Sequence, residues 1–329
     1  MPSATSNYEL KKIVKEIIDQ QPDINSVFFV GCGASRSDLY PAYYFLNENS
    51  KTIRTSIHTA NEFNMATPKA VNEHAIVITC SLSGGTPETA KATTVAKEHG
   101  AHTIAVTHQE NSPITVNADH VILFGWSAEY SSKMDKMIKV ILLAGEILNQ
   151  VEGYEAYDKL YAAADKIYGL IDETVKHVGP DAEKFAEQYK DAPIVYVTSS
   201  GAMQEIAWSF AACLMMEMQW IPASTFNDGD FFHGPFEMVD KGVPYLLFMN
   251  DGRTRQMDAR AMTFIQRFDG LLTVIDAKDY GLASIADPEV IDYFNPVIVS
   301  SVARVYAEKI AEKRNHPLTK RRYMWKLQY

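Results

Sequence analysis

Short apolar runs without alternation, each followed by a turn of small residues and then a helical pattern, constrain the fold of this chain most. Val27–Val30, Ala75–Cys80 and Ile194–Val197 are such runs. A strand that is apolar at consecutive positions is buried on both faces, as in a parallel sheet. An order that alternates strands and helices places helices on both faces of that sheet. The sequence therefore predicts an α/β protein with mainly parallel sheets flanked by helices.

The expected elements repeat in the two halves of the chain. Val30 and Gly84 are 54 residues apart, and Val197 and Gly252 are 55 residues apart. In each half a strand leads into a small-residue turn and a helix, and about fifty residues later a second strand ends in a glycine-containing turn. We expect a duplicated unit, with domains at residues 1–155 and 156–329. The other expected elements are helices at Asn7–Gln20, Ser131–Gln150, Lys159–Val178, Ile206–Trp220 and Thr254–Phe268, and strands at His102–Thr107, His120–Phe124, Pro244–Met249 and Leu271–Asp276.

Charge, hydropathy and cysteine content exclude several classes of protein. The formal net charge of -10 argues against nucleic-acid binding, which needs a stripe of Lys and Arg. No run of ~18 apolar residues predicts a membrane span, and Met1–Gln21 lacks the apolar core of a signal peptide, so we expect a cytoplasmic protein. The odd, separated cysteines Cys32, Cys80 and Cys213 predict neither disulfides nor a metal site. We expect buried thiols at Cys32 and Cys80.

Two turns in the first half have the chemistry of an anion site. Gly31-Cys32-Gly33-Ala34-Ser35 follows the first strand, and Ser81-Leu82-Ser83-Gly84-Gly85-Thr86 follows the second. Each turn precedes a helix, with Thr86 as the expected N-cap and Pro87 in the first turn, so free N–H groups and hydroxyls would converge on one phosphate. Plain turns and helix caps are the alternative. The residues predicted to bind phosphate are Gly33, Ser35, Ser81, Ser83 and Thr86.

The corresponding turn of the second half lacks this pattern. Asn250–Thr254 has an acid, Asp251, where the first half has Ser83. A carboxylate beside a phosphate is unfavourable, so we expect one phosphate site per chain, in the first half. NAD is not expected, because Arg36 stands where a dinucleotide-binding turn needs its third glycine.

Two segments of the second half carry titratable groups in unusual surroundings. Glu217 is a lone acid in the apolar helix expected over Ile206–Trp220. A carboxylate there is costly unless it is paired or functional, so Glu217 is either a general base with a raised pKa or a partnered structural acid. His233 lies on a constrained loop, between Phe232 and Gly234-Pro235. It is either a proton shuttle or a loop histidine bonded to backbone.

Taken together, these motifs resemble the double sugar isomerase (SIS) domain family over nearly the whole chain. The two Ser/Gly turns are similar to that family's phosphate loops. Glu217 and Phe232–Pro235 resemble the catalytic glutamate and the histidine motif in the isomerase half of glucosamine-6-phosphate synthase. The segments Met216–Trp220, Phe231–Glu237 and Asn315–Lys326 are more similar to the fructosamine-6-phosphate deglycases. The resemblance implies two tandem SIS-type domains, each a flavodoxin-like three-layer unit.

This resemblance also implies an activity. A 6-phosphorylated Amadori sugar amine would be hydrolysed to a hexose 6-phosphate and a free amine, without a cofactor. Fructoselysine 6-phosphate is the first candidate, before the glucoselysine and the asparagine or aspartate conjugates. Glu217 would be the base, and His233 would help to open the ring and move protons. Weaker positional analogy adds Ser132, Lys133 and Lys326 as substrate contacts.

The family resemblance further implies a homodimer or a higher homo-oligomer, with His233 placed against a neighbour's pocket. The chain begins with Met1-Pro2 and has no cysteine before Cys32, so the cysteine nucleophile of a glutaminase domain is not expected. Gly229-Asp230 stands where the deglycases usually have Gly-Glu. Two other functions stay open. A phosphosugar isomerase or a hexosamine-phosphate deaminase would use the same proton chemistry, whereas a non-enzymatic sugar-phosphate sensor would not need Glu217 and His233.

Overall fold

The computed structural model describes residues 4–328, which form two compact units that meet between Asp165 and Lys166 in the sequence. Helix α6 (Tyr157–Thr174) begins in the first unit and ends in the second. The boundary expected after residue 155 lies just before this helix and stays a prediction. Residues 1–3 and 329, which the expected domain ranges include, lie outside the described residues. Between residues 4 and 328, no helix is long and apolar enough to cross a membrane.

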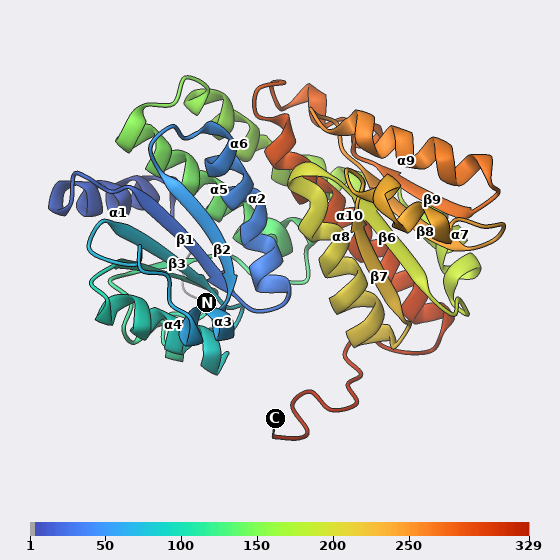
Figure 1. Cartoon of the computed structure of the whole chain (residues 1–329), viewed down its shortest axis with the longest axis horizontal. Coiled ribbons are helices and arrows are strands. Elements are labelled where there is room, and N and C mark those ends of the chain that lie inside the picture. Colours follow the sequence, from blue (N-terminus) through green and yellow to red (C-terminus); the bar gives the residue numbers. More distant parts are fainter. Residues whose placement is uncertain (1–3, 329) are drawn as a thin grey trace. The chain divides into compact units, whose positions relative to one another are not determined.

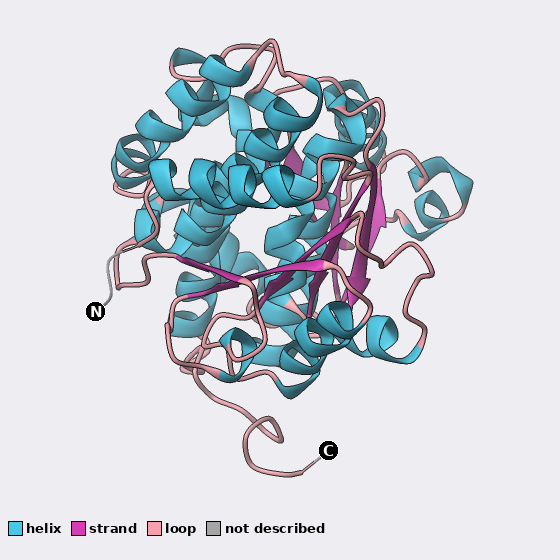
Figure 2. Ribbon diagram, turned by 90° about the vertical axis from the view of Figure 1, so that its left-hand side faces the viewer, coloured by secondary structure: helices cyan, strands magenta, loops and turns pink. Residues whose placement is uncertain are grey.

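The first unit is built on a five-stranded parallel sheet with the strand order β2-β1-β3-β4-β5 (Figures 1 and 2). Strands β1 and β3 are buried at every position, as continuous apolar runs require. The elements of this unit, in chain order, are α1 (Asn7–Gln20), β1 (Ser26–Gly31), α2 (Ala34–Asn49), β2 (Arg54–Thr59), α3 (Ala60–Met65), β3 (Ala75–Cys80), α4 (Pro87–Glu98), β4 (His102–Thr107), η1 (Pro113–Thr115), β5 (His120–Leu123) and α5 (Tyr130–Glu152).

Helices cover both faces of this sheet. Phe28 and Val77 point to one face, where they pack against Phe63 of α3 and the alanines of α4. Phe29 points to the other face and contacts Tyr43 of α2, and α2 in turn packs against the long helix α5. The first unit is therefore the three-layer arrangement that the sequence predicts.

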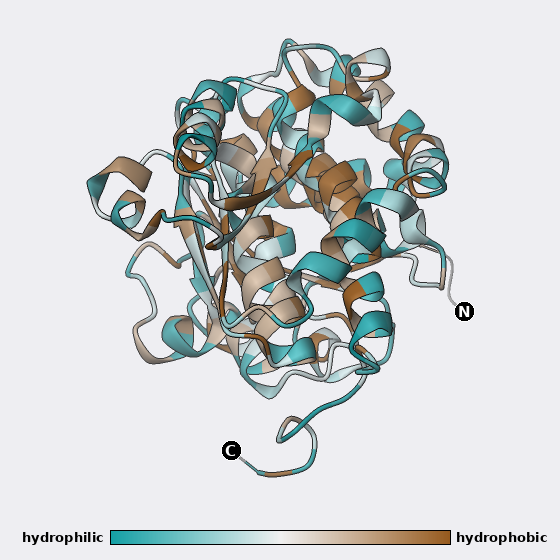
Figure 3. Cartoon of the chain, turned by 90° about the vertical axis from the view of Figure 1, so that its right-hand side faces the viewer, coloured by the Kyte–Doolittle hydropathy of each residue, from teal (hydrophilic) through white to brown (hydrophobic). Residues whose placement is uncertain are grey.

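The second unit repeats this plan with four parallel strands in the order β7-β6-β8-β9. That order matches β2-β1-β3-β4 of the first unit, as expected for a duplication. Apolar residues lie on the strands and the inward helix faces (Figure 3). The elements are α7 (Gly179–Tyr189), β6 (Val195–Ser199), η2 (Gly201–Met203), α8 (Gln204–Ser209), η3 (Phe210–Gln219), β7 (Ala223–Asn227), η4 (Phe231–His233), η5 (Pro235–Met238), β8 (Pro244–Met249), α9 (Arg255–Arg267), β9 (Leu271–Asp276), η6 (Ala277–Tyr280), η7 (Leu282–Ser284) and α10 (Ile291–Lys313).

The helix that carries Glu217 has unusual geometry. It begins as the α-helix α8 and continues as η3, a π-helix over Phe210–Gln219. Trp220 then ends it in the left-handed conformation, with φ of 56°. The sequence predicts this helix but not its π geometry. Such geometry is rare and occurs frequently at functional sites.

Several elements of the structure are absent from the sequence-based prediction, and strands β2 and β7 and helix α10 are the examples with a clear physical reason. Strands β2 and β7 lie at sheet edges and are only partly buried, so their sequences lack the continuous apolar pattern. Helix α10 is buried on nearly all sides and contains Pro296, which hides its amphipathic signal. The structure also differs from the prediction at Gly179-Pro180. These two residues were expected to end a helix, whereas they form the start of α7.

Candidate active site

The two Ser/Gly turns of the first unit lie side by side. Strands β1 and β3 are neighbours, with Gly31 paired to Cys80 at their carboxyl ends. The chain leaves β1 toward β2 on one side, whereas β3 lies on the other side, so the strand order reverses here. In open parallel sheets this reversal opens a crevice in which ligands bind.

The first turn brings an uncapped helix N-terminus to that crevice. Gly33 is the N-cap of α2, has φ of +55° and offers no side-chain hydrogen bond to the helix. A Cβ at Gly33 would meet no atom within 4 Å, so the backbone there faces open space. A Cβ at Gly31 would lie 3.1 Å from the Arg36 nitrogen and 3.3 Å from the Cys80 oxygen. Glycine thus permits the close approach of the turn to β3.

The second turn also leaves donors free. Thr86 is the N-cap of α4, as predicted, but its hydroxyl does not cap the helix. That hydroxyl lies 3.0 Å from the Ser81 Oγ instead, while Ser83 is exposed. Within the described part of the chain, the N–H groups of Ser83, Gly85 and Thr86 donate to no protein acceptor. Free N–H groups and hydroxyls at a helix N-terminus suit a phosphate.

Ser35 faces the end of β3 together with a buried ion pair that sequence reasoning missed. The Ser35 hydroxyl bonds to the Cys80 thiol, whose pKa burial raises to about 11. Lys136 of α5 pairs with Asp38 of α2 at 2.5 Å, and only 5% of the Lys136 side chain is exposed. The Lys136 charge also acts on the Cys80 thiol. The signal in the sequence is a group of charged residues at the start of a helix that is apolar in its middle turns, namely Lys133, Asp135, Lys136 and Lys139.

The two weaker candidates of this unit lie on the first turn of α5. Lys133 is half-buried, and its ammonium lies 4.6 Å from the centre of the Tyr130 ring. Ser132 lies beside Gly125, with its Oγ 3.5 Å from where a Cβ of that glycine would be. Cys32 is only partly buried, whereas Cys80 is buried. The expectation of a buried thiol is therefore wrong for Cys32, because it lies in the open turn after β1.

Ser83→Ala or Thr86→Ala is expected to raise the KM for a 6-phosphorylated substrate about 10- to 100-fold. Each substitution removes one charge-assisted hydrogen bond, which contributes ~1.5–3 kcal/mol. Steady-state kinetics measures this effect, with Thr94→Ala on the same helix α4 as the control. Phosphate bound only near Asn250–Thr254 in a crystal would show that the wrong half was chosen.

The equivalent crevice of the second unit is filled by its own side chains. The buried Asp258 carboxylate accepts hydrogen bonds from the Ser200 hydroxyl at 2.5 Å and from the Asn250 N–H at 2.9 Å. Thr254 lies over Gly201, where a Cβ would be 2.5 Å from the threonine Oγ1. An internal carboxylate therefore takes the donors that a phosphate would need. The acid in this place is Asp258, not Asp251 as the sequence suggested.

That carboxylate belongs to a buried acidic pair. Burial raises the pKa of Asp228, and the nearby charge of Asp258 raises it further. Burial also raises the pKa of Asp258, against hydrogen bonds from Ser200 and Asn250 that lower it. Asp228 additionally accepts a hydrogen bond from Thr198. The pair favours a bound proton and anchors the start of the loop that carries His233.

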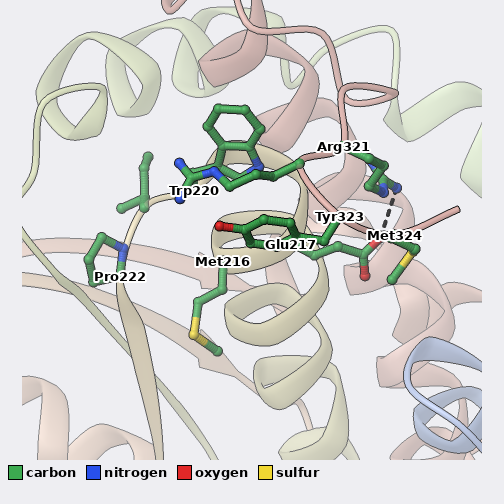
Figure 4. A pocket seen from close by; sticks show the side chains of 9 residues that line it. Met216, Glu217, Trp220, Pro222, Arg321, Tyr323 and Met324 are labelled. Atoms are coloured by element: carbon green, nitrogen blue, oxygen red, sulfur yellow. Dashed lines mark ion pairs between the residues drawn. The ribbon is translucent and has the colours of Figure 1, made fainter. Parts of the chain in front are cut away.

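Glu217 lies at the edge of a cavity of about 400 Å³ in the second unit. Its carboxylate pairs with Arg321 at 2.8 Å, and 25% of the Glu217 side chain is exposed. Figure 4 shows Glu217 and Arg321 facing each other, with Trp220 and Tyr323 nearby. The lining also includes Pro222 and Arg322. The end of the π-helix and the C-terminal segment thus form the cavity together.

Two opposing effects set the acidity of Glu217. Burial raises the pKa of this carboxyl group, and the charge and hydrogen bond of Arg321 lower it. The net direction is upward. The sequence left open whether Glu217 is a partnered acid or a base with a raised pKa, and in the structure it is a partnered acid whose pKa is raised. Such a group accepts a proton more readily than an ordinary surface glutamate.

Arg321→Gln is expected to move the acid limb of the pH–rate profile to higher pH. Arg321 holds the Glu217 pKa down, so its loss lets burial raise that pKa further. A base works only when deprotonated, and activity would then disappear at a higher pH as the solution is acidified. Profiles of kcat/KM for wild type and variant measure the shift. An acid limb that is unchanged or moves to lower pH would contradict this coupling.

His233 is exposed on a firmly anchored loop. It ends the short helix η4, and its N–H donates to the Asp230 carbonyl at 2.9 Å. The preceding Phe231 is fully buried, and the ring of Phe232 lies 3.9 Å from the Arg260 guanidinium carbon. The loop is therefore held from within while the imidazole points outward.

Within one chain, Glu217 lies at the amino ends of the strands of the second sheet, and His233 lies at their carboxyl ends. The π-helix with Glu217 leads into the amino end of β7, and the loop with His233 leaves its carboxyl end. Five strand residues at about 3.3 Å each separate these ends by about 16 Å. His233 is not among the described residues that line the Glu217 cavity. The structure does not bring the two predicted catalytic side chains together.

Lys326, in the C-terminal segment, is the last of the three weaker candidates for substrate contacts. Its ammonium donates to the Arg321 carbonyl at 2.6 Å, and the residue does not appear in the described cavity lining. The structure therefore gives Lys326 the role of supporting the backbone at Arg321. From residue 4 to residue 328, no cluster of three His, Cys, Asp or Glu could hold a metal ion.

Comparison with known proteins identifies the family. Residues 23–150 match the SIS domain. The chain is 35% identical to the fructosamine deglycase FrlB of Bacillus subtilis (strain 168) over 327 residues, which cover 99% of each chain. The chain belongs to the SIS domain family. The expected family and its α/β fold with two tandem parallel sheets are thereby confirmed.

Two further SIS domain relatives agree with this assignment. The fructoselysine 6-phosphate deglycase of Escherichia coli O157:H7 is 25% identical over 269 residues, or 80% of this chain and 76% of that protein. A crystal structure from Salmonella typhimurium LT2, provisionally described as a phosphosugar isomerase, is 37% identical with a TM-score of 0.93. That similarity covers 98% of this SIS domain chain and 99% of the other.

Proposed function

We propose that this SIS domain chain hydrolyses a 6-phosphorylated Amadori sugar amine to a hexose 6-phosphate and a free amine. The observation that carries the proposal is the half-buried Glu217, whose raised pKa and pairing with Arg321 suit a general base at a cavity. Full-length similarity to a fructosamine deglycase supports the same activity. Fructoselysine 6-phosphate is the first substrate to test, because a more distant relative is named for it.

The proposed chemistry transfers protons and then adds water. Glu217 removes a proton from carbon 1 of the open-chain ketosamine, the electron pair forms a double bond to carbon 2, and the carbonyl oxygen of carbon 2 takes up a proton to complete the enaminol. Protonation of carbon 2 then gives a protonated imine at carbon 1. Water adds to this imine, the carbon–nitrogen bond breaks, and the amine leaves with a proton. Each step needs only a positioned acid or base.

The phosphate supplies binding energy that orients the reacting carbons. We assign it to the free N–H groups and hydroxyls of the first unit, at Gly33, Ser35, Ser81, Ser83 and Thr86. The filled crevice of the second unit supports this choice, because Asp258 already occupies its donors. One phosphate per chain follows from that difference.

His233 is proposed to act in a neighbouring subunit's pocket. Its exposure, and its separation from the Glu217 of its own chain by the length of β7, support a site shared between two chains. There it would help to open the sugar ring and move protons. A homodimer is the smallest assembly that satisfies this arrangement.

The activity is tested with three compounds given separately to the purified protein. These are fructoselysine 6-phosphate, unphosphorylated fructoselysine and glucosamine 6-phosphate. We expect hexose 6-phosphate and lysine from the first compound only. Ammonia from glucosamine 6-phosphate would favour a deaminase, and binding of the phosphorylated compounds without turnover would favour a sensor.

A further inference from the structure

The cavity beside Glu217 is lined by two arginines that make different contacts. Arg321 forms the ion pair with Glu217. Arg322 also lines the cavity, and among the described residues no carboxylate lies within ion-pair distance of it. Among the described residues, the charged lining is thus two guanidinium groups against one carboxylate, although the whole chain has a formal net charge of -10. Such a local excess of positive charge favours an anionic ligand.

Trp220 holds Arg322 in place. Its ring lies 4.3 Å from the Arg322 guanidinium carbon, and its left-handed backbone, with φ of 56°, ends the π-helix at the cavity. The His316 ring packs against the same ring in a T-shaped arrangement, with 4.4 Å between the ring centres. A guanidinium group that lies on an aromatic face keeps its N–H groups free, because they point outward in the plane of the guanidinium itself. Those N–H groups match the two oxygens of a carboxylate.

We propose that Arg322 binds a carboxylate on the amine half of the substrate, so that the chain acts on amino-acid conjugates in preference to conjugates of simple alkyl amines. This inference rests on the proposed function. The amine is attached to the sugar carbon from which Glu217 removes a proton, so the amine half is the part of the substrate nearest the Glu217 cavity.

Matched substrates with and without the carboxylate test the proposal. One pair of 6-phosphorylated Amadori compounds carries lysine, linked through its side-chain amine, or 1,5-diaminopentane. A second pair carries alanine or ethylamine. For wild type, kcat/KM is expected to be about 10- to 100-fold higher for the carboxylate member of at least one pair, as for a charge-assisted hydrogen bond to a paired group. Arg322→Gln is expected to remove that preference by lowering only the carboxylate member's value.

Lys320→Gln is the matched control. The Lys320 ammonium also lies over Trp220, at 5.0 Å, but the residue does not appear in the cavity lining. This variant should keep the wild-type preference, whereas Arg322→Lys, which keeps the charge but not the planar fork, should retain only part of it.

The outcomes separate this inference from the proposed function. If wild type cleaves both members of each pair equally well, the carboxylate site is wrong and the deglycase activity stands. If Arg322→Gln lowers both members equally, the arginine serves the shared sugar phosphate and the inference also fails. If wild type cleaves none of the four compounds, the proposed function itself is overturned, and with it the inference that rests on it.

Discussion

Glu217→Gln is expected to lower kcat by ~10²–10⁴-fold, the usual contribution of a general acid–base group. Glutamine keeps the size of the side chain and a hydrogen-bond acceptor for Arg321, but it cannot take a proton from carbon. The fold and the binding of the phosphosugar should survive, because the phosphate is assigned to the other unit. Steady-state turnover and calorimetric binding of a hexose 6-phosphate measure the two effects separately.

A second acid–arginine pair in the same unit provides the control for this variant. Glu308 pairs with Arg304 on α10 at 2.8 Å and has no part in the Glu217 cavity. Glu308→Gln should therefore leave turnover unchanged. If Glu217→Gln retains activity within about threefold of wild type, Glu217 is not the base, since general bases contribute far more.

Mixing two inactive variants is expected to restore activity. A Glu217→Gln chain and a His233→Ala chain would each be inactive alone if both groups are required. In a mixed dimer, one of the two sites would hold an intact Glu217 from one chain and an intact His233 from the other. For a dimer with random exchange, about a quarter of the sites in an equal mixture would be complete, because each intact group is present in half of the chains.

The complementation requires proof that subunits exchange. A tagged chain that retains its untagged partner on an affinity column provides it, and each variant alone at the same total concentration gives the baseline. If exchange is demonstrated and activity stays at that baseline, His233 serves its own chain and the shared-site account fails. A dimer with private sites would then remain the simplest assembly.

The buried parts of the fold follow from the sequence because they carry continuous patterns. The expected bounds Ala75–Cys80 and His102–Thr107 match β3 and β4 residue for residue. Both strands are central in the sheet, where burial on two faces leaves few polar positions. The edge strand β7 was missed because its residues are only partly buried. Its polar sequence, Ala223–Asn227, reads as a loop.

Parts of the candidate site depend on contacts that no local pattern reveals. Arg321, the partner of Glu217, is more than one hundred positions away along the chain. Asp258 fills the second crevice from the first turn of α9, whereas the sequence of the preceding turn pointed to Asp251. The two Ser/Gly turns were recognisable because glycine, serine and a helix start have local signatures. Pairing between distant segments has none.

The fate of carbon 1 of the sugar tests the central claim most directly. A 6-phosphorylated Amadori compound labelled with carbon-13 at that position is incubated with the protein and followed by NMR. The account predicts that the signal of the amine-bearing carbon is replaced by the anomeric signals of an aldose 6-phosphate, with one free amine released per labelled sugar. A labelled carbon that rearranges but stays bonded to nitrogen, or that does not change at all, would contradict hydrolysis of the sugar amine.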